Sequence, residues 1–310
     1  MARFAIVTSE EIPRQMPAAF RALMPEHEFA LYPELGEAAS IDYAVAWKPP
    51  PGVLAGLRNL KATLSFAAGV ESFLSDPHMP RGVPIVRAVS DVSRATMSGY
   101  AMAQILRYHH RLDLYAGQQQ MGHWKKTMPR EPAETTVTIL GTGVLGADLA
   151  TRLLPFGFPV VGWSRNAKNL PGIRNLHGAA AFEEAMRAGN IVVCLLPLTT
   201  ETRNILDARA FKLMPRESYL INMGRGGHVV GADLIGALDS GQLAGATLDV
   251  TDPEPLPEGD PLWAHAKVTI TPHIAGLMPP RRIMQNMADT VRHCLASGNF
   301  ENIADLDRGY

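Results

Sequence analysis

Three polar residues in the last third of the chain could act together on a small ligand. Arg225 stands between two glycines, Glu254 stands among prolines, and His273 follows a proline, each just beyond a short apolar stretch. If these stretches are strands of one parallel sheet, the three side chains lie beyond its carboxyl edge, where open α/β sheets bind ligands. The arginine fork suits a carboxylate, and the histidine suits proton transfer. The ordinary alternatives are a surface arginine, a solvated loop glutamate and a histidine with a structural hydrogen bond.

A glycine-rich segment directly follows the apolar stretch Thr136–Leu140 and opens a helical pattern. Its residues are Gly141, Thr142, Gly143, Val144, Leu145 and Gly146. In this spacing the first glycine permits a tight turn, the second lets a pyrophosphate approach the backbone, and the third allows the helix to pack closely on the strand. The helix N-terminus then stabilises the anion. The strand–loop–helix context predicts a dinucleotide-binding site.

The end of the next expected strand indicates which dinucleotide binds. An NAD site places Asp or Glu about 20 residues further on, to bind the ribose 2′-hydroxyl. Here Trp163, Ser164, Arg165 and Lys168 lie in the segment GWSRNAK, which has no carboxylate. A carboxylate would repel a 2′-phosphate, whereas Arg165 can bind it with two hydrogen bonds. We therefore expect NADPH rather than NADH; the alternative is a solvated loop with ordinary surface cations.

Two series of short apolar runs predict two parallel sheets, because helix-sized segments separate many of them. The first series has four expected strands, at residues 3–8, 43–47, 62–67 and 84–89. The second has six, at residues 136–140, 159–163, 191–196, 218–222, 246–250 and 267–271. A stretch without proline predicts one long helix over 93–120, and shorter helices are expected over 146–156, 233–240 and 280–297.

The composition excludes several classes of protein. The 310 residues carry 29 Lys plus Arg against 30 Asp plus Glu, so no general polycation is available for nucleic acid or an anionic membrane. No apolar run approaches the roughly 18 residues of a membrane helix, and the run Phe4–Val7 is too short for a signal peptide. Cys194 and Cys294 have neither disulfide-framework nor zinc-site spacing, so we expect no metal and a reducing cytoplasm.

The chain resembles the D-isomer-specific 2-hydroxyacid dehydrogenases, most densely between Thr136 and Gly276. The matching segments are GTGVLG, LLPLTTETRNIL, LINMGRGG, ALDSGQLAGATLDVTDPEPLP and VTITPHIAG. Within that family it is most similar to the bacterial glyoxylate/hydroxypyruvate reductase A group, through the shorter segments YAVAWKPP, AAGVE, GWSR and RGY. The resemblance implies an α/β fold with two doubly wound parallel-sheet domains. A smaller flavodoxin-like substrate domain would span residues 1–97 and 282–310, and a Rossmann NAD(P)-binding domain residues 98–281.

The same resemblance implies that Arg225, Glu254 and His273 are the catalytic residues. Hydride addition to a 2-keto acid leaves negative charge on the carbonyl oxygen, to which protonated His273 would donate a proton. Glu254 would orient the imidazole and favour its charged form. Arg225 would hold the substrate carboxylate and polarise the carbonyl. Loss of any one should cost roughly 100-fold or more in rate.

The resemblance alone implies further contacts with the substrate and the cofactor. The backbone N–H groups of Ala68, Gly69 and Val70 would bind the substrate carboxylate, and Trp47 would form a wall of the pocket; a plain strand-to-helix turn and a core tryptophan are the alternatives. Further residues would contact the cofactor. Leu196 and Pro197 would pass beneath the nicotinamide, Asp249 would bind its carboxamide, and Asn222 would lie nearby.

The implied activity is NADPH-dependent reduction of small 2-keto acids, glyoxylate to glycolate and hydroxypyruvate to D-glycerate, by a homodimer. The segment 123–126 would lean into a neighbouring active site, or be a solvated loop. A related dehydrogenase acting on 3-phosphoglycerate is one alternative, but it needs more cations near residues 47–52 and 68–72, where the sequence has only Lys48. The other alternative is a non-catalytic dinucleotide-sensing scaffold, against which the intact catalytic set argues.

Overall fold

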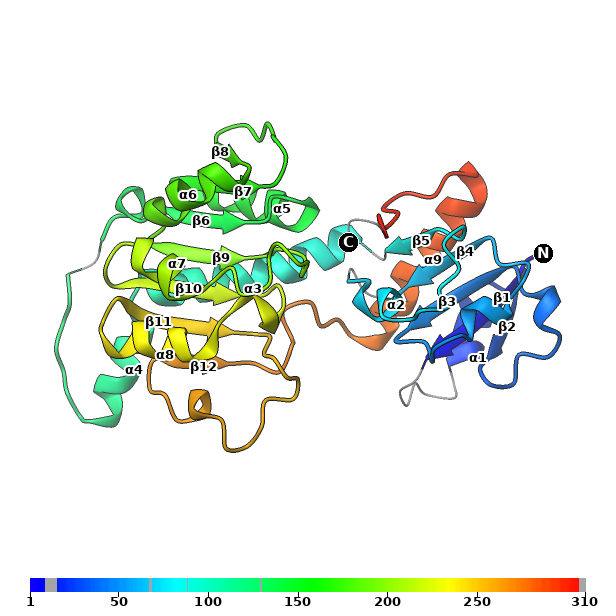
Figure 1. Ribbon diagram of the computed structural model, residues 1–310, viewed down its shortest axis with the longest axis horizontal. Helices are drawn as coiled ribbons and strands as arrows, with labels where there is room; N and C mark the ends of the chain where they lie inside the picture. The colour runs from blue at the N-terminus through cyan, green and yellow to red at the C-terminus, as the bar shows by residue number, and fades with distance from the viewer. Residues whose placement is uncertain (9–15, 67–68, 88, 129, 307–310) are drawn as a thin grey trace. The chain divides into compact units, whose positions relative to one another are not determined.

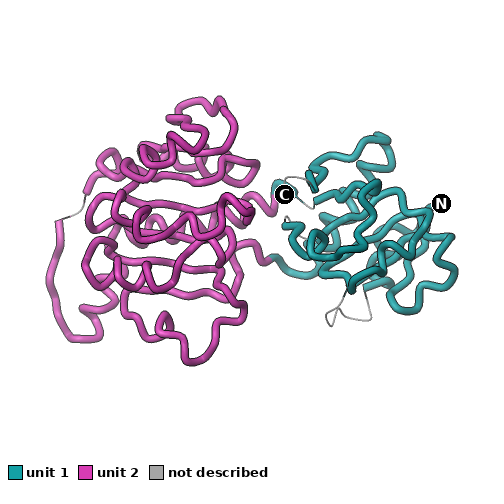
Figure 2. Tube along the Cα trace, in the orientation of Figure 1, with its two compact units in different colours: residues 1–91, 278–310 teal, residues 92–277 magenta. Residues whose placement is uncertain are grey.

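The computed structural model describes residues 1–8, 16–66, 69–87, 89–128 and 130–306. The chain divides into two compact units (Figure 2). The first comprises residues 1–91 and 278–310, and the second comprises residues 92–277. The sequence placed the corresponding boundaries after residues 97 and 281, and the assignment of the first unit to substrate binding stays a prediction.

The first unit is built on a five-stranded parallel sheet in the order β2-β1-β3-β4-β5. Its strands are β1 (Arg3–Thr8), β2 (Glu28–Leu31), β3 (Tyr43–Trp47), β4 (Ala62–Ser65) and β5 (Ile85–Arg87). This is the flavodoxin-like order expected of the smaller domain. The sequence missed β2, a short edge strand whose apolar run is only three residues long. Two strands are shorter than the predicted ranges 62–67 and 84–89: residues 66, 84 and 89 are not in strands, and residues 67 and 88 lie outside the described residues.

Helices cover this sheet on both faces (Figure 1). On one face α1 (Met16–Leu23) and α9 (Pro280–Ser297) pack on alternate strand residues such as Phe4 and Ile6. On the other, Phe73 of α2 (Glu71–Leu74) packs with Ala5 and Val7. The alternation follows from the two-residue side-chain repeat of a strand. Helix α9, from the end of the chain, packs on the first sheet, so this compact unit is made of two separate stretches of sequence.

The second unit contains a seven-stranded parallel sheet in the order β12-β11-β10-β9-β6-β7-β8. The strands are β6 (Val137–Leu140), β7 (Val160–Ser164), β8 (Arg174–His177), β9 (Ile191–Cys194), β10 (Ser218–Asn222), β11 (Leu243–Leu248) and β12 (Val268–Ile270). The first six in chain order reproduce the dinucleotide-binding arrangement of a Rossmann fold. All six strands predicted in this block are present. The sequence missed β8, whose polar residues RNLH form the exposed edge strand.

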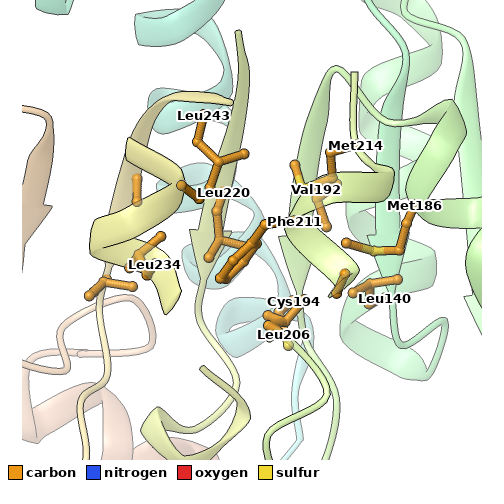
Figure 3. Packing of buried hydrophobic residues seen from close by; sticks show 14 of the residues in the cluster. Leu140, Met186, Val192, Cys194, Leu206, Phe211, Met214, Leu220, Leu234 and Leu243 are labelled. Carbon is orange, nitrogen blue, oxygen red and sulfur yellow. The ribbon is translucent and has the colours of Figure 1, made fainter. Parts of the chain in front are cut away.

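Both faces of this sheet are also covered by helices, as a doubly wound fold requires. On one face α3 (Asp91–His109) and α5 (Val144–Leu153) pack on strand residues such as Ile139 and Val193. On the other lie α6 (Phe182–Ala188), α7 (Ala208–Leu213) and α8 (Gly231–Asp239). Figure 3 shows this second core, in which Phe211 of α7 lies among leucine and methionine side chains.

The long helix predicted over 93–120 is two helices. After α3 the chain breaks at Arg111, whose φ of +57° is left-handed, and α4 (Leu112–Gln120) follows. No glycine or proline stands at the break. A left-handed conformation costs a non-glycine residue about 1–2 kcal/mol, so a continuous helix is what the sequence predicts here. Short 3₁₀ turns complete the described elements: η1 (Ala38–Ser40), η2 (Leu54–Gly56), η3 (Pro132–Glu134), η4 (Leu154–Phe156), η5 (Ala179–Ala181), η6 (Gly226–His228) and η7 (Pro261–Trp263). Within the described ranges, none of the helices combines the length and apolar character needed to cross a membrane.

Candidate active site

The three candidate catalytic residues follow neighbouring strands of the second sheet. Arg225 lies beyond β10, Glu254 beyond β11 and His273 beyond β12, and these strands are adjacent and parallel. Parallel strands present their carboxyl ends along the same edge, so the order of the chain brings the three loops together there. This is the arrangement that the strand pattern predicted.

Glu254 and His273 form a direct pair. The Nδ1 atom of His273 lies 2.9 Å from Oε2 of Glu254, and the main-chain N–H of Thr251 donates to the other carboxylate oxygen, Oε1, at 3.2 Å. The side chains of His273 and Glu254 are 49% and 39% exposed. Because Glu254 accepts the hydrogen on Nδ1, the ring is oriented with Nε2 available to exchange a proton with a ligand.

The backbone at His273 is strained and held from one side by Asp249. His273 has a φ of +54°, a conformation that non-glycine residues rarely adopt. Its N–H donates to the main-chain oxygen of Asp249 at 2.8 Å. The Asp249 carboxylate is 2% exposed and accepts hydrogen bonds from the main-chain N–H groups of Ile274 and Ala275 and from the Thr271 hydroxyl. In the structure this buried acid therefore fixes the histidine loop; contact with a nicotinamide stays a prediction.

The turn that carries Arg225 is organised by Asn222. The Asn222 side chain accepts from the N–H of Gly224 at 3.2 Å and donates to the main-chain oxygen of Arg225 at 3.0 Å. The guanidinium donates to the Gly224 carbonyl at 2.7 Å, and the side chain is half-buried. Gly226 is required for the close approach of the next loop, because a Cβ there would lie 1.9 Å from the Thr251 carbonyl carbon.

The glycine loop has the shape expected of a pyrophosphate cradle. Gly141 has a φ of +101°, and a Cβ on Gly146 would lie 2.0 Å from the Gly141 carbonyl oxygen. A Cβ on Gly143, the N-cap of α5, would meet no described atom within 4 Å, so this part of the loop is open to a ligand. The Thr142 hydroxyl is buried without a described hydrogen-bond partner, which leaves a donor for an acceptor outside the protein. Val144 and Leu145 open α5, whose N-terminus attracts anions. These residues fit a dinucleotide.

The end of β7 presents cations and no carboxylate. Ser164 is half-buried, and Arg165 and Lys168 are exposed. A hydrogen bond from Thr199, and to a smaller extent the charge of Arg165, lowers the pKa of Glu201, so the guanidinium lies near the loop that follows β9. Trp163, in contrast, packs in the core: it is 7% exposed, and its indole N–H donates to Gly178 at 2.9 Å.

The chain after β9 passes close to the arginine turn. A Cβ on Gly224 would lie 2.9 Å from the main-chain oxygen of Leu196. The carbonyl of Pro197 accepts from the Thr202 hydroxyl at 2.7 Å.

Burial raises the pKa of the nearby Cys194 thiol to about 12, so this cysteine is no nucleophile near neutral pH. Within the described residues, no three His, Cys, Asp or Glu side chains are placed to hold a metal ion.

The expected substrate contacts outside this sheet lie in the first unit. Trp47 ends β3, and the Lys48 ammonium lies 5.6 Å from the centre of its ring. Gly69 and Val70 precede α2, and the Val70 side chain is buried. Ala68 lies outside the described residues. A role of these residues in substrate binding stays a prediction.

Three residues that support the site were missed by sequence reasoning. Thr271 donates its hydroxyl proton to Asp249, so the hydroxyl of Tyr100, 2.6 Å away, donates to Thr271. Thr251 supplies the N–H that holds Glu254. Thr251 follows an expected strand, as the candidate catalytic residues do, and Thr271 is the last residue of the expected strand 267–271; these positions were the available signal. Tyr100, which α3 brings to the loop, offered no sequence signal.

Comparison with known proteins agrees with this geometry. Residues 102–275 match the model of the D-isomer specific 2-hydroxyacid dehydrogenase NAD binding domain. The glyoxylate/hydroxypyruvate reductase A of Serratia proteamaculans is 38% identical over 280 residues, which cover 89% of this chain and 90% of the relative.

Solved structures extend the similarity to both units. A D-isomer specific 2-hydroxyacid dehydrogenase from Xanthobacter autotrophicus Py2, in complex with NADPH and MES, superposes with a TM-score of 0.92 at 35% identity, covering 100% of this chain and 99% of the other. An NADPH-dependent glyoxylate/hydroxypyruvate reductase from Sinorhizobium meliloti, in complex with NADP and sulfate, gives a TM-score of 0.90 at 33% identity, with 100% of each chain covered. The candidate catalytic loops and the glycine loop agree with these similarities, and the chain belongs to the D-isomer-specific 2-hydroxyacid dehydrogenase family.

Proposed function

We propose that this protein reduces small 2-keto acids, glyoxylate and hydroxypyruvate, with NADPH as the hydride donor. The observation that carries the proposal is the Glu254–His273 pair, 2.9 Å apart, on the strand ends next to the Arg225 turn. Reduction of a 2-keto acid requires a proton donor held in a fixed orientation and a cation that binds the substrate carboxylate. The names and bound cofactors of the relatives described above support this choice of substrate and cofactor.

Each residue has one task in this reaction. NADPH, when bound, supplies the hydride that adds to C2 of the keto acid. Arg225 binds the substrate carboxylate, and its fixed positive charge favours the growing negative charge on the carbonyl oxygen. His273 donates the Nε2 proton to that oxygen, which gives the hydroxyl group of the product. Glu254 keeps the ring in place through its contact with Nδ1 and so directs Nε2 toward the substrate.

The preference for NADPH rests on the end of β7. Arg165 and Lys168 are exposed there, and Ser164 is close by, whereas an NAD-binding relative would place a carboxylate at this point. We assign the ribose 2′-phosphate to Arg165, with Ser164 and Lys168 beside it. Thr142, Gly143 and the N-terminus of α5 would hold the pyrophosphate. Leu196, Pro197 and Asp249 are assigned to the nicotinamide half.

The proposal is tested by initial rates of cofactor oxidation with glyoxylate and with hydroxypyruvate, each with NADPH and with NADH. We expect kcat/KM to be at least tenfold higher with NADPH, a difference of about 1.4 kcal/mol that a single phosphate contact can supply. His273→Gln should lose roughly 100-fold or more in kcat. His293→Gln, the same change at an exposed residue of α9, serves as the matched control.

Each other outcome has a distinct meaning. A preference for NADH would overturn the cofactor assignment and leave the catalytic residues in place. Turnover of 3-phosphohydroxypyruvate but of neither proposed substrate would make the chain a dehydrogenase of the phosphoglycerate type. Tight NADPH binding without turnover of any 2-keto acid would support a dinucleotide-sensing scaffold instead.

We also propose a homodimer that works in the cytoplasm. Apolar side chains are concentrated on α4 and the segment after it, where Trp124 is 96% exposed and Leu112, Met121 and Met128 are also exposed. A second copy of the chain would bury this surface. Trp124→Ser should shift the mass measured by light scattering from dimer to monomer, whereas Phe156→Ser, on another exposed apolar residue, should not. A wild-type monomer at micromolar concentration would contradict the proposal.

A further inference from the structure

A fully buried histidine lies directly behind the arginine turn. His228 is 0% exposed and ends the 3₁₀ turn η6, which begins one residue after Arg225. Its Nδ1 atom lies 3.0 Å from the main-chain nitrogen of Arg225, and its Nε2 atom lies 3.2 Å from the carbonyl oxygen of Pro197. One ring therefore joins the turn after β10 to the segment after β9.

These two contacts determine the form of the ring. The Arg225 nitrogen carries a hydrogen, so Nδ1 must accept and has no proton of its own. The Pro197 carbonyl can only accept, so Nε2 must carry the proton and donate it. Both bonds form together only when His228 is neutral with its hydrogen on Nε2.

Packing reinforces the link between the two segments. A Cβ on Gly224 would lie 3.0 Å from Nδ1 and Cε1 of the His228 ring and 2.9 Å from the Leu196 carbonyl oxygen. The ring thus lies against the backbone immediately before Arg225. The guanidinium in turn donates to the Gly224 carbonyl, so a displacement of this backbone moves both ends of the arginine.

We propose that His228 is a positioning residue that sets the place of Arg225 relative to the Leu196–Pro197 segment through its Nε2–H form. The inference rests on the proposed function, in which Arg225 binds the substrate carboxylate and Leu196–Pro197 lies beneath the nicotinamide. His228 itself is fully buried and acts through Arg225 and Pro197. The Nδ1 bond holds the arginine for the keto acid, and the Nε2 bond holds the proline carbonyl for the cofactor.

Two substitutions separate the bonds. In His228→Asn the amide oxygen replaces Nδ1 as the acceptor for Arg225, and the donor to Pro197 is lost. In His228→Gln the amide nitrogen replaces Nε2 as the donor to Pro197, and the acceptor for Arg225 is lost. We expect H228Q to raise KM for glyoxylate about tenfold, which corresponds to about 1.4 kcal/mol, with the NADPH Kd changed less than about twofold. H228N should weaken NADPH binding several-fold and leave the glyoxylate KM within about twofold of wild type.

The controls separate positioning from general stability. Thermal unfolding of both variants is measured alongside that of His293→Gln. If His228 were merely structural, each variant would change the glyoxylate KM and the NADPH Kd together, in proportion to its loss of stability. The proposal would be overturned if H228Q and H228N changed the glyoxylate KM and the NADPH Kd equally, or if neither variant changed either constant. If wild type turns over no keto acid, the proposed function fails, but the NADPH Kd of H228N still reports on the Pro197 bond.

A spectroscopic measurement on the unaltered protein tests the same inference if both variants fail to fold. Imidazole nitrogens can be observed by long-range proton–nitrogen correlation in protein labelled at histidine. His228 is recognised by its contacts with the Gly224 protons. We expect an unprotonated Nδ1 and a protonated Nε2. A proton on Nδ1, in either the neutral or the charged ring, would be incompatible with the bond to Arg225 and would refute the proposal.

Discussion

The buried carboxylate of Asp249 holds the loop of His273 in a left-handed conformation that the histidine would not adopt by itself. The main-chain oxygen of Asp249 accepts the His273 N–H at 2.8 Å, and its two carboxylate oxygens each accept the N–H of one of the next two residues at 2.9 Å. A φ of +54° at a non-glycine residue persists only where the surroundings impose it. The position of the proposed proton donor thus depends on an acid that need not touch the substrate.

Asp249→Asn should therefore impair both stability and catalysis. The amide retains one acceptor, and its NH₂ group faces a backbone N–H, which leaves a buried donor unsatisfied. We expect a loss of about 1–3 kcal/mol in the free energy of unfolding, measured with urea, and a fall in kcat larger than the change in KM. Asp239→Asn, on an exposed side chain of the same unit, is the control. A variant with wild-type kcat would show that the clamp is dispensable.

Glu254→Gln should slow the reaction by weakening the hold on the His273 ring. The substitution keeps the size of the side chain but removes the charge next to Nδ1 of His273. Without that charge the proton-donating ring is held less firmly, so kcat should fall about 10- to 100-fold. Glu258→Gln, which changes an exposed glutamate four residues further on, should leave kcat at the wild-type value.

Most of the fold could be predicted from the sequence because its signals are local. Ten apolar runs predicted ten strands of the two sheets, and the loop from Gly141 to Gly146 identified the first strand of the Rossmann unit. The missed strands β2 and β8 are each four residues long and lie at sheet edges; the apolar run of β2 is short, and β8 is mostly polar. The break at Arg111 could not be predicted, because no glycine, asparagine or proline at this point indicates a left-handed backbone conformation.

The sequence predicted that the three candidate catalytic residues lie at one sheet edge, but not most of the hydrogen bonds that hold their loops. Arg225, Glu254 and His273 each stand just beyond a strand, where the chain order itself brings them to one edge. Their positions depend on hydrogen bonds between segments far apart in sequence, such as those from Tyr100 to Thr271 and from His228 to Pro197. Such contacts are fixed by tertiary packing, which sequence spacing does not encode.

Arg165→Ala tests the cofactor assignment separately from catalysis. The substitution removes the cation expected to bind the 2′-phosphate, so the Kd for NADPH should rise about tenfold or more while the Kd for NADH changes little. Quenching of protein fluorescence or calorimetric titration measures both constants. Lys212→Ala removes an exposed cation on α7 and should affect neither. An equal loss of affinity for the two cofactors would place the 2′-phosphate elsewhere.

Gly226→Ala tests whether this glycine is needed because the Arg225 and Glu254 loops pack closely against each other, and not because it gives the backbone flexibility. The added Cβ would lie 1.9 Å from the Thr251 carbonyl carbon, so the Arg225 and Glu254 loops must move apart. We expect a loss of about 1–3 kcal/mol in unfolding free energy and a marked fall in kcat. At Gly236, in α8, the same substitution meets no described atom within 4 Å and should stabilise the helix by about 0.5–1 kcal/mol. Equal tolerance at both positions would contradict the close packing of the two loops.

Asp148 should make stability depend on pH in acid solution. Burial by itself would raise the pKa of this carboxyl, but hydrogen bonds from Arg152 and from Ser98 of α3 outweigh burial, and the pKa is lowered. A lowered folded-state pKa means that the stabilisation is present above the unfolded-state value of about 3.9 and is lost as pH falls through the folded-state value. Asp148→Asn should therefore be less stable than wild type at pH 7, and the difference should shrink as urea titrations are repeated toward pH 3. Asp289→Asn, on an exposed side chain of α9, should change the unfolding free energy less. A difference for Asp148→Asn that stayed constant down to pH 3 would mean that the charge of this residue does not link α3 to α5.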